Sequence, residues 1–131
     1  MSSGDLFVID DNPADIRFIE EALSVSELTP TIHTVNTKDE ALDFIYQRNE
    51  YEDTPRPDVV LLNWRLSQTT GKEILNAAQS ATPPLPVVVM TSSKPQMQSE
   101  NAPVSRPDQI IEKPTDPEMY TELLRPYLST Q

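Results

Sequence analysis

The chain has 131 residues, of which 37% are hydrophobic, enough for one globular domain with its own core. It contains no cysteine and one histidine, which excludes disulfides and thiol catalysis and argues against a zinc site. Its 21 acidic and 10 basic residues give a formal net charge of −11, which disfavours binding to nucleic acid or to anionic membranes.

We expect a single domain over residues 1–131 and a cytoplasmic location, because no segment resembles a membrane span or a signal sequence. The acidic residues are scattered along the chain, and only four of the cations are lysine. This pattern indicates a surface solvated at high salt, as in halophilic proteins. An ordinary acidic cytosolic protein is the alternative, and composition leaves both open.

Apolar runs and helical repeats alternate along the chain. Residues 6–9, 59–62 and 87–90 are nearly continuous apolar runs, typical of strands in a parallel sheet covered on both faces. Residues 31–35 and 110–111 are weaker runs, as expected of edge strands. The intervening segments carry apolar residues at helical spacing. The pattern predicts an α/β fold with a five-stranded parallel sheet, helices on both faces, and strands one, three and four in the centre.

Local signals support these boundaries. Pro13 after Asn12 begins the first helix, Thr37 caps the second, and Asp116 with Pro117 opens the last. Three prolines within residues 93–108 allow only a short fourth helix. With two glycines in all, the chain has no phosphate-binding glycine loop, which excludes a nucleotide-binding Rossmann or P-loop protein.

Polar residues stand at the carboxyl ends of the first, third, fourth and fifth predicted strands, where ligands bind in open parallel sheets. These residues are Asp10 and Asp11, Asn63, Thr91 and Lys113. Two carboxylates suit Mg²⁺, while a hydroxyl and a lysine can both contact a phosphoryl group. A third carboxylate at position 63 would be the nucleophile toward a phosphoryl donor, but an asparagine amide cannot form an acyl phosphate.

This order of residues resembles the CheY-like receiver domain of response regulators, over nearly the whole chain. The segments DDNPADIRFIEEAL, ALDFIYQRNEYEDTPRPDVVLLNW and VVVMTSS are similar to small standalone receivers that partner phytochrome-type and related histidine kinases. The resemblance implies a flavodoxin-like strand order of 2-1-3-4-5. It also implies that Asp10 and Asp11 are the metal-binding pair, Asn63 the acceptor position, Thr91 the switch hydroxyl and Lys113 the phosphate-sensing lysine.

Three features depart from the family pattern. Asn63 replaces the acceptor aspartate, Ile110 replaces the aromatic residue that moves when the switch hydroxyl moves, and the proline-rich stretch replaces a regular fourth helix. We expect Mg²⁺ binding at Asp10 and Asp11 to be weakened or absent, because one negative charge is missing. We also expect Lys113 to donate a hydrogen bond to the side-chain oxygen of Asn63.

The leading hypothesis is a phosphorylation-independent receiver, not an enzyme, that acts through contacts with a histidine kinase, another signalling protein or a second copy of itself. The alternative is a conventional phosphoacceptor of a two-component system whose acceptor aspartate is mutated to Asn63. A third class, a small hydrolase or a ligand-binding flavodoxin-like protein, lacks a nucleophile and an oxyanion donor set.

Overall fold

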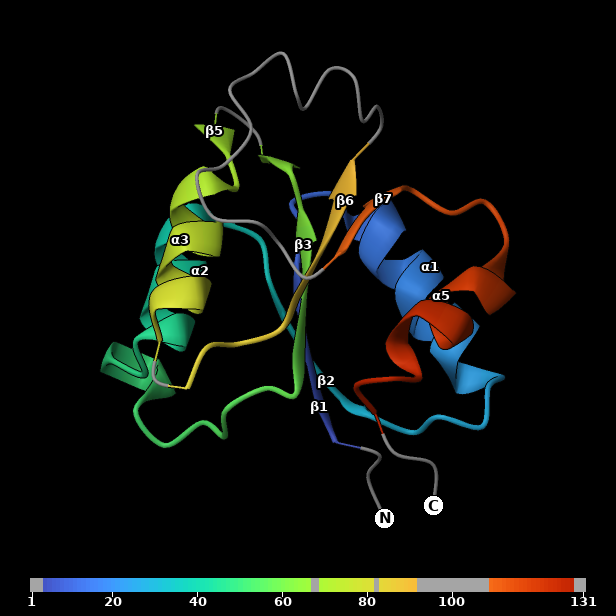
Figure 1. Cartoon of the computed structure of the whole chain (residues 1–131), viewed down its shortest axis with the longest axis horizontal. Helices are drawn as coiled ribbons and strands as arrows, with labels where there is room; N and C mark the ends of the chain where they lie inside the picture. The colour runs from blue at the N-terminus through green and yellow to red at the C-terminus, as the bar shows by residue number, and fades with distance from the viewer. Residues whose placement is uncertain (1–3, 67–68, 82, 92–108, 129–131) are drawn as a thin grey trace.

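The computed structural model describes residues 4–66, 69–81, 83–91 and 109–128 (Figure 1). Its main sheet contains five parallel strands, namely β1 (Asp5–Ile9), β2 (Thr31–Val35), β3 (Val59–Asn63), β6 (Val87–Thr91) and β7 (Gln109–Glu112). The helices are α1 (Pro13–Ser24), α2 (Lys38–Ile45), the 3-10 turn η1 (Asn49–Tyr51), α3 (Lys72–Ser80) and α5 (Pro117–Leu124).

The strand order is β2-β1-β3-β6-β7. Because β6 and β7 are the fourth and fifth strands of this sheet in chain order, the predicted order 2-1-3-4-5 is confirmed. Strands β1, β3 and β6 are buried on both sides, whereas the edge strand β2 is exposed or half-exposed except at Val35, as its weaker apolar pattern predicts.

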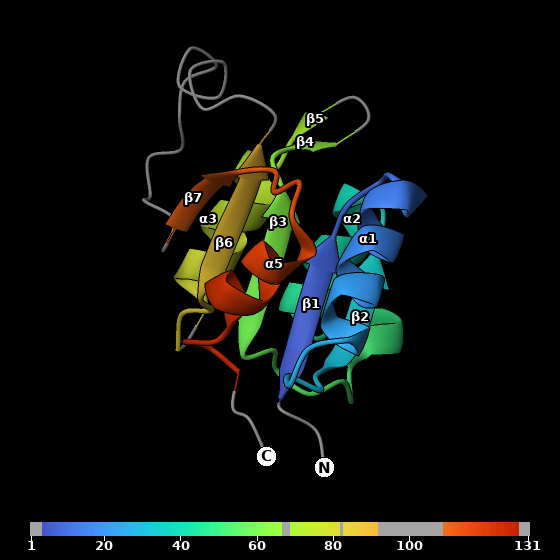
Figure 2. The ribbon, with the colours of Figure 1, turned by 90° about the vertical axis from the view of Figure 1, so that its right-hand side faces the viewer.

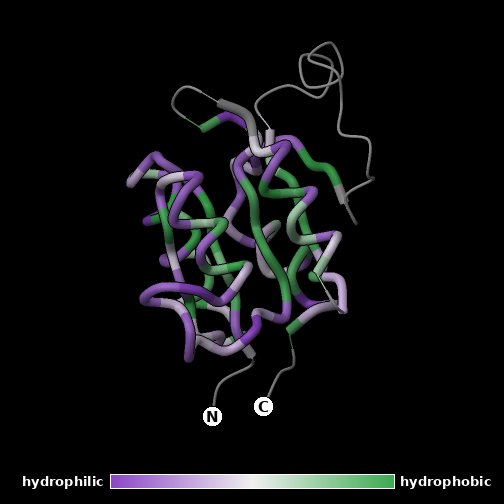
Figure 3. The backbone as a smooth tube through the Cα atoms, turned by 90° about the vertical axis from the view of Figure 1, so that its left-hand side faces the viewer, coloured by the Kyte–Doolittle hydropathy of each residue, from purple (hydrophilic) through white to green (hydrophobic). Residues whose placement is uncertain are grey.

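Two apolar cores lie on opposite faces of the sheet. One is packed beneath α2 and α3 and includes Phe7, Phe44 and Ile74. The other is packed beneath α1 and α5, which lie side by side in Figure 2, and includes Ile19 and Leu124. Figure 3 shows the apolar residues gathered on the strands and on the sides of the helices that face them. The three-layer arrangement follows from the alternation of side chains along each strand.

The predicted helix starts are confirmed. The side chains of Asn12, Thr37 and Asp116 accept hydrogen bonds from backbone N–H groups in the first turns of α1, α2 and α5. Pro13 and Pro117 occupy the first turn, where their missing N–H leaves no hydrogen bond unmade. Each cap satisfies a backbone donor at the carboxyl edge of the sheet and so fixes where the helix leaves that edge.

A short antiparallel hairpin, β4 (Arg65–Leu66) with β5 (Thr69–Thr70), follows β3 and was not predicted. Gly71 comes next and is the N-cap residue of α3; a Cβ atom there would lie 2.9 Å from the fully buried side chain of Leu62. The expected short fourth helix in residues 93–108 lies outside the described residues. No helix in the described part of the chain is long and apolar enough to cross a membrane.

Candidate functional site

The carboxyl ends of β1, β3, β6 and β7 bring the expected polar residues to one edge of the sheet. Asp10 directly follows β1 and is 0% exposed, while Asn63 and Thr91 are the last residues of β3 and β6 and are each 6% exposed. Lys113 follows β7, and its backbone N–H donates to the carbonyl of Thr91 at 2.9 Å. Parallel register thus places side chains far apart in the sequence within one small site.

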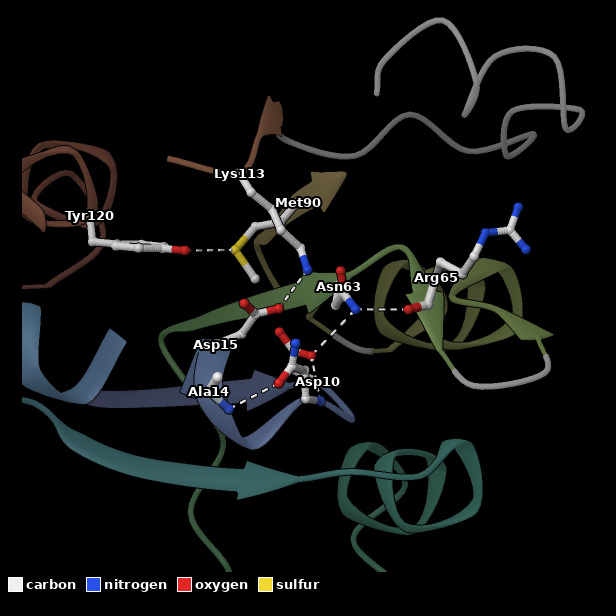
Figure 4. Close-up of polar contacts among 9 residues, drawn as sticks. Asp10, Ala14, Asp15, Asn63, Arg65, Met90, Lys113 and Tyr120 are labelled. Atoms are coloured by element: carbon white, nitrogen blue, oxygen red, sulfur yellow. Dashed lines mark hydrogen bonds and ion pairs between the residues drawn. The ribbon is translucent and has the colours of Figure 1, made fainter. Parts of the chain in front are cut away.

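Asn63 lies at the centre of this site, between β1 and the hairpin (Figure 4). Its side-chain nitrogen Nδ2 donates to the backbone carbonyl of Arg65 at 2.7 Å and to Oδ1 of Asp10 at 3.3 Å. The same Asp10 oxygen accepts the backbone N–H of Asn12 at 2.9 Å. The Arg65 side chain extends away from Asp10, so the hairpin contributes a carbonyl oxygen to the site.

Lys113 differs from our expectation. Its ammonium Nζ donates to Oδ2 of Asp15, in the first turn of α1, at 2.5 Å (Figure 4). We had expected it to donate to the side-chain oxygen of Asn63. The reason is electrostatic, because a carboxylate attracts an ammonium group more strongly than a neutral amide oxygen does. The prediction of a Lys113–Asn63 hydrogen bond was therefore wrong.

Asp15 is the site residue that the sequence analysis missed. It lies three positions after the cap Asn12, in the first turn of a helix that starts at the carboxyl edge of the sheet. Acidic residues are common in first turns for reasons of helix stability alone, so the residue type carried no distinct signal. Asp15 and Lys113 are 98 residues apart in the sequence, so the sequence alone did not predict that they form an ion pair.

Burial dominates the electrostatics of Asp10. Removal from water, together with the nearby Asp15 carboxylate, raises the pKa of its carboxyl group from 3.8 to about 6. The Asn12 N–H group and the charge of Lys113 act in the opposite direction. Within the described residues, Oδ2 of Asp10 is buried without a hydrogen-bond partner. The ionised form of Asp10 is therefore poorly stabilised by its own surroundings.

Tyr120 of α5 lies beside the site, in the core on the α1–α5 face of the sheet (Figure 4). It is buried, its ring contacts Phe18 edge to face, and its hydroxyl donates to Sδ of Met90 at 3.5 Å. Burial, with the charges of Asp15 and Asp10, raises the pKa of Tyr120 to about 12. The hydroxyl of this buried tyrosine therefore stays protonated at neutral pH.

The remaining candidate residues lie around this centre. Asp11 is half-buried and lines a cavity of about 360 Å³ beside the start of α1, together with Pro13 and Glu20. Ile110 is half-buried on β7 and packs against the core under α2 and α3. Trp64, the only tryptophan in the chain, is 2% exposed in that same core.

Asp10 and Asp11 are the two carboxylates of the predicted metal-binding pair. At position 63, where a third carboxylate would complete the site, the chain has the amide of Asn63. In the described part of the chain no three acidic, histidine or cysteine side chains are grouped so that they could hold a metal ion. Moreover, Oδ1 of Asp10 already accepts two N–H groups, one of them from Asn63. The residues present here therefore do not fit a tightly bound divalent cation.

Residues 6–125 match the family model described as the response regulator receiver domain. The chain is 34% identical over 91 residues to the response regulator Rcp1 of Synechocystis sp.. That match includes 67% of this chain and 61% of Rcp1, so the sequence match spans about three fifths of this relative's length.

Two solved structures are similar over most of the chain. The phosphorylated cyanobacterial phytochrome response regulator RcpA is 29% identical, with a TM-score of 0.78 over 94% of this chain and 89% of its own. The Mn²⁺-bound form of Rcp1 has a TM-score of 0.82 at 24% identity, over 98% of this chain and 96% of its own, and supports the fold. The chain therefore belongs to the response regulator receiver domain family of two-component signalling.

Proposed function

We propose that this receiver, over residues 1–131, regulates its partner by protein contact and independently of phosphorylation at position 63. The observation that carries the proposal is the buried asparagine at the end of β3. An amide oxygen is a poor nucleophile, and an acyl phosphate cannot form on it unless the side chain is first converted to aspartate.

Ile110 supports the same proposal. By the family resemblance, its position carries an aromatic ring that swings inward when the switch hydroxyl, here that of Thr91, moves. An isoleucine has no ring to report such a movement, and this one packs against the core beneath α2 and α3. Acceptor and readout are thus both altered, which favours a receiver whose surface is the same whether or not a phosphodonor is present.

We further propose that Asp10 and Asp11 bind Mg²⁺ only weakly. Receivers similar in fold have been described with a bound metal, as in the Mn²⁺ form of Rcp1. In this chain the neutral Asn63 removes one of the charges that would attract the ion. A function that needs no phosphoryl transfer also needs no ion to stabilise it.

The partner we propose is a histidine kinase, of the phytochrome type by similarity to RcpA, or another signalling protein. A second copy of the chain is a further candidate, since receivers often pair with themselves. The net charge of −11 favours partners whose contact surface is basic and disfavours direct binding to DNA. Regulation would then depend on the fraction of partner molecules to which this chain is bound, and the chain would not turn over a substrate.

The alternative is a conventional phosphoacceptor receiver in which asparagine stands where the working protein has aspartate. The presence of Asp10, Asp11, Thr91 and Lys113 around position 63 favours it, because these residues would be of use to a phosphorylated aspartate. The two proposals differ in what an aspartate at position 63 would do in the cell, and in whether the native chain has any phosphoacceptor.

Intact-mass measurement tests whether the chain has lost its phosphoacceptor or whether a residue other than Asn63 accepts the phosphoryl group. The native chain and Asn63→Asp would be incubated with Mg²⁺ and a small acyl phosphate, at low and at high salt. We expect no phosphoryl adduct on the native chain and one on the variant, because the variant restores the nucleophile. An adduct on the native chain would contradict the proposal and show that another residue accepts the phosphoryl group.

A further inference from the structure

The two N–H bonds of the Asn63 side chain join three parts of the site. Nδ2 donates to Oδ1 of Asp10, which follows β1, and to the carbonyl of Arg65, which begins β4. The orientation of the amide is fixed by chemistry: exchanging its nitrogen and oxygen would set a carbonyl oxygen against two other oxygens. A positively polarised group therefore lies between a carboxylate and a carbonyl.

A carboxylate and a backbone carbonyl facing one point are also oxygen ligands of the kind that hard cations prefer. Here the amide hydrogens occupy that point. We infer that the Asn63 carboxamide takes the place of a divalent cation in this receiver, bridging Asp10 to Arg65 and holding the β3–β4 turn against β1 without any bound ion.

The bridge fixes more than a single turn. The residue between Asn63 and Arg65 is Trp64, whose backbone N–H donates to the carbonyl of Met90 at 2.8 Å and whose carbonyl accepts the N–H of Gly71 at 2.6 Å. Gly71 in turn begins α3. An amide that ties Arg65 to Asp10 thus also fixes the start of α3 relative to β1 and β6.

A carboxylate at position 63 would have the opposite effect. It would lose both donors, leave the Arg65 carbonyl facing another oxygen, and add a negative charge beside Asp10, which is buried. A divalent cation would then be needed to compensate. The inference rests on the proposed function, in which Asn63 is the working residue, and explains how the site keeps one conformation in the absence of metal.

Thermal unfolding tests the inference in the full chain, with MgCl₂ compared against NaCl at matched ionic strength. We expect Mg²⁺ to leave the melting temperature of the native chain unchanged and to raise that of Asn63→Asp by about 5 °C or more. Without Mg²⁺, the variant should melt below the native chain. Gln79→Glu, which adds a negative charge near the far end of α3, is the control, and Mg²⁺ should change its melting temperature no more than that of the native chain.

Asn63→Ala removes the bridge without adding charge. We expect it to melt below the native chain and to gain nothing from Mg²⁺. In case Asn63→Asp does not fold, hydrogen exchange of the Asn63 side-chain amide in the native protein gives an independent test, and we expect it to be slower than that of exposed amides.

Two results would overturn the inference: a native chain stabilised by Mg²⁺ as much as Asn63→Asp, or rapid exchange of the Asn63 side-chain protons. Neither would restore a phosphoacceptor, so the proposed function would survive them. Conversely, a phosphoryl adduct on another residue of the native chain would contradict the proposed function while leaving the amide bridge intact.

Discussion

Asp10 is fully buried, and the carboxylate of Asp15 lies near enough to oppose its ionisation. Its pKa is raised from 3.8 to about 6, so the folded chain binds this proton more readily than the unfolded chain does. In metal-free protein the contribution of Asp10 to stability is therefore most favourable below pH 3.8. It is lost as the pH rises from 3.8 through 6.

Replacing Asp10 by asparagine removes this ionisation and keeps an oxygen that can accept from Asn12 and Asn63. We expect Asp10→Asn to match the native chain in stability near about pH 4 and to exceed it by about 1 to 3 kcal/mol near neutral pH. Chemical denaturation in the presence of a chelator, across this pH range, measures the difference. A difference that stays constant with pH would show that Asp10 does not titrate as described.

Lys113 and Asp15 form a half-buried ion pair that connects β7 to α1. A double-mutant cycle with Lys113→Met and Asp15→Asn should give a coupling energy of about 1 to 2 kcal/mol, since a partly desolvated charged hydrogen bond is stronger than an exposed one. The exposed pair Arg17–Glu21 serves as a control and should couple by about 0.5 kcal/mol or less. Equal coupling in the two pairs would count against a special role for Asp15.

At the scale of elements, the central strands and the helix starts could be predicted from the sequence. Strands β1, β3 and β6 are uninterrupted apolar runs, and their ends agree with the structure to within one residue. The caps at Asn12 and Asp116 were equally clear, because a capping side chain followed by proline acts through neighbouring residues only. Elements that are determined by residues close together in the chain could therefore be predicted from the sequence alone.

Other elements could not be predicted, because they depend on neighbours that are distant in the chain. The β4–β5 hairpin consists of two-residue strands, too short to show any periodicity. Whether the Lys113 ammonium group donates to Asn63 or to Asp15 depends on where α1 lies relative to β7. Sequence spacing does not reveal this position. The convergence of the strand ends was expected from topology, but the amide bridge to Arg65 was not.

The cap of α5 offers a test at this scale. The side chain of Asp116 accepts the backbone N–H of Glu118 at 3.0 Å, and α5 packs against α1 next to the site. We expect Asp116→Ala to lower the free energy of unfolding by about 1 kcal/mol, while Asp116→Asn, which keeps the acceptor, should change it by a few tenths. Equal losses in both variants would point to the charge of Asp116 and not to its hydrogen bond. Thermal or chemical unfolding provides the measurement.

At the scale of the whole molecule, a net charge of −11 on 131 residues implies appreciable self-repulsion in the folded state. Salt screens such repulsion, because the Debye length falls from roughly 10 Å at 0.1 M to 3 Å at 1 M. We therefore expect the melting temperature to rise by several degrees between these concentrations of KCl. A melting temperature that falls, or does not change, would contradict a surface adapted to high salt.

We propose that the site of this receiver is fixed in one state by its own residues, with Asn63 in place of both acceptor and cation. The most direct test is a comparison of backbone ¹H–¹⁵N NMR spectra before and after addition of Mg²⁺ and a small acyl phosphate. We expect no shifts at Asn63, Thr91, Ile110 or Lys113 in the native chain, and clear shifts in Asn63→Asp. The same shifts in the native chain would contradict the proposal.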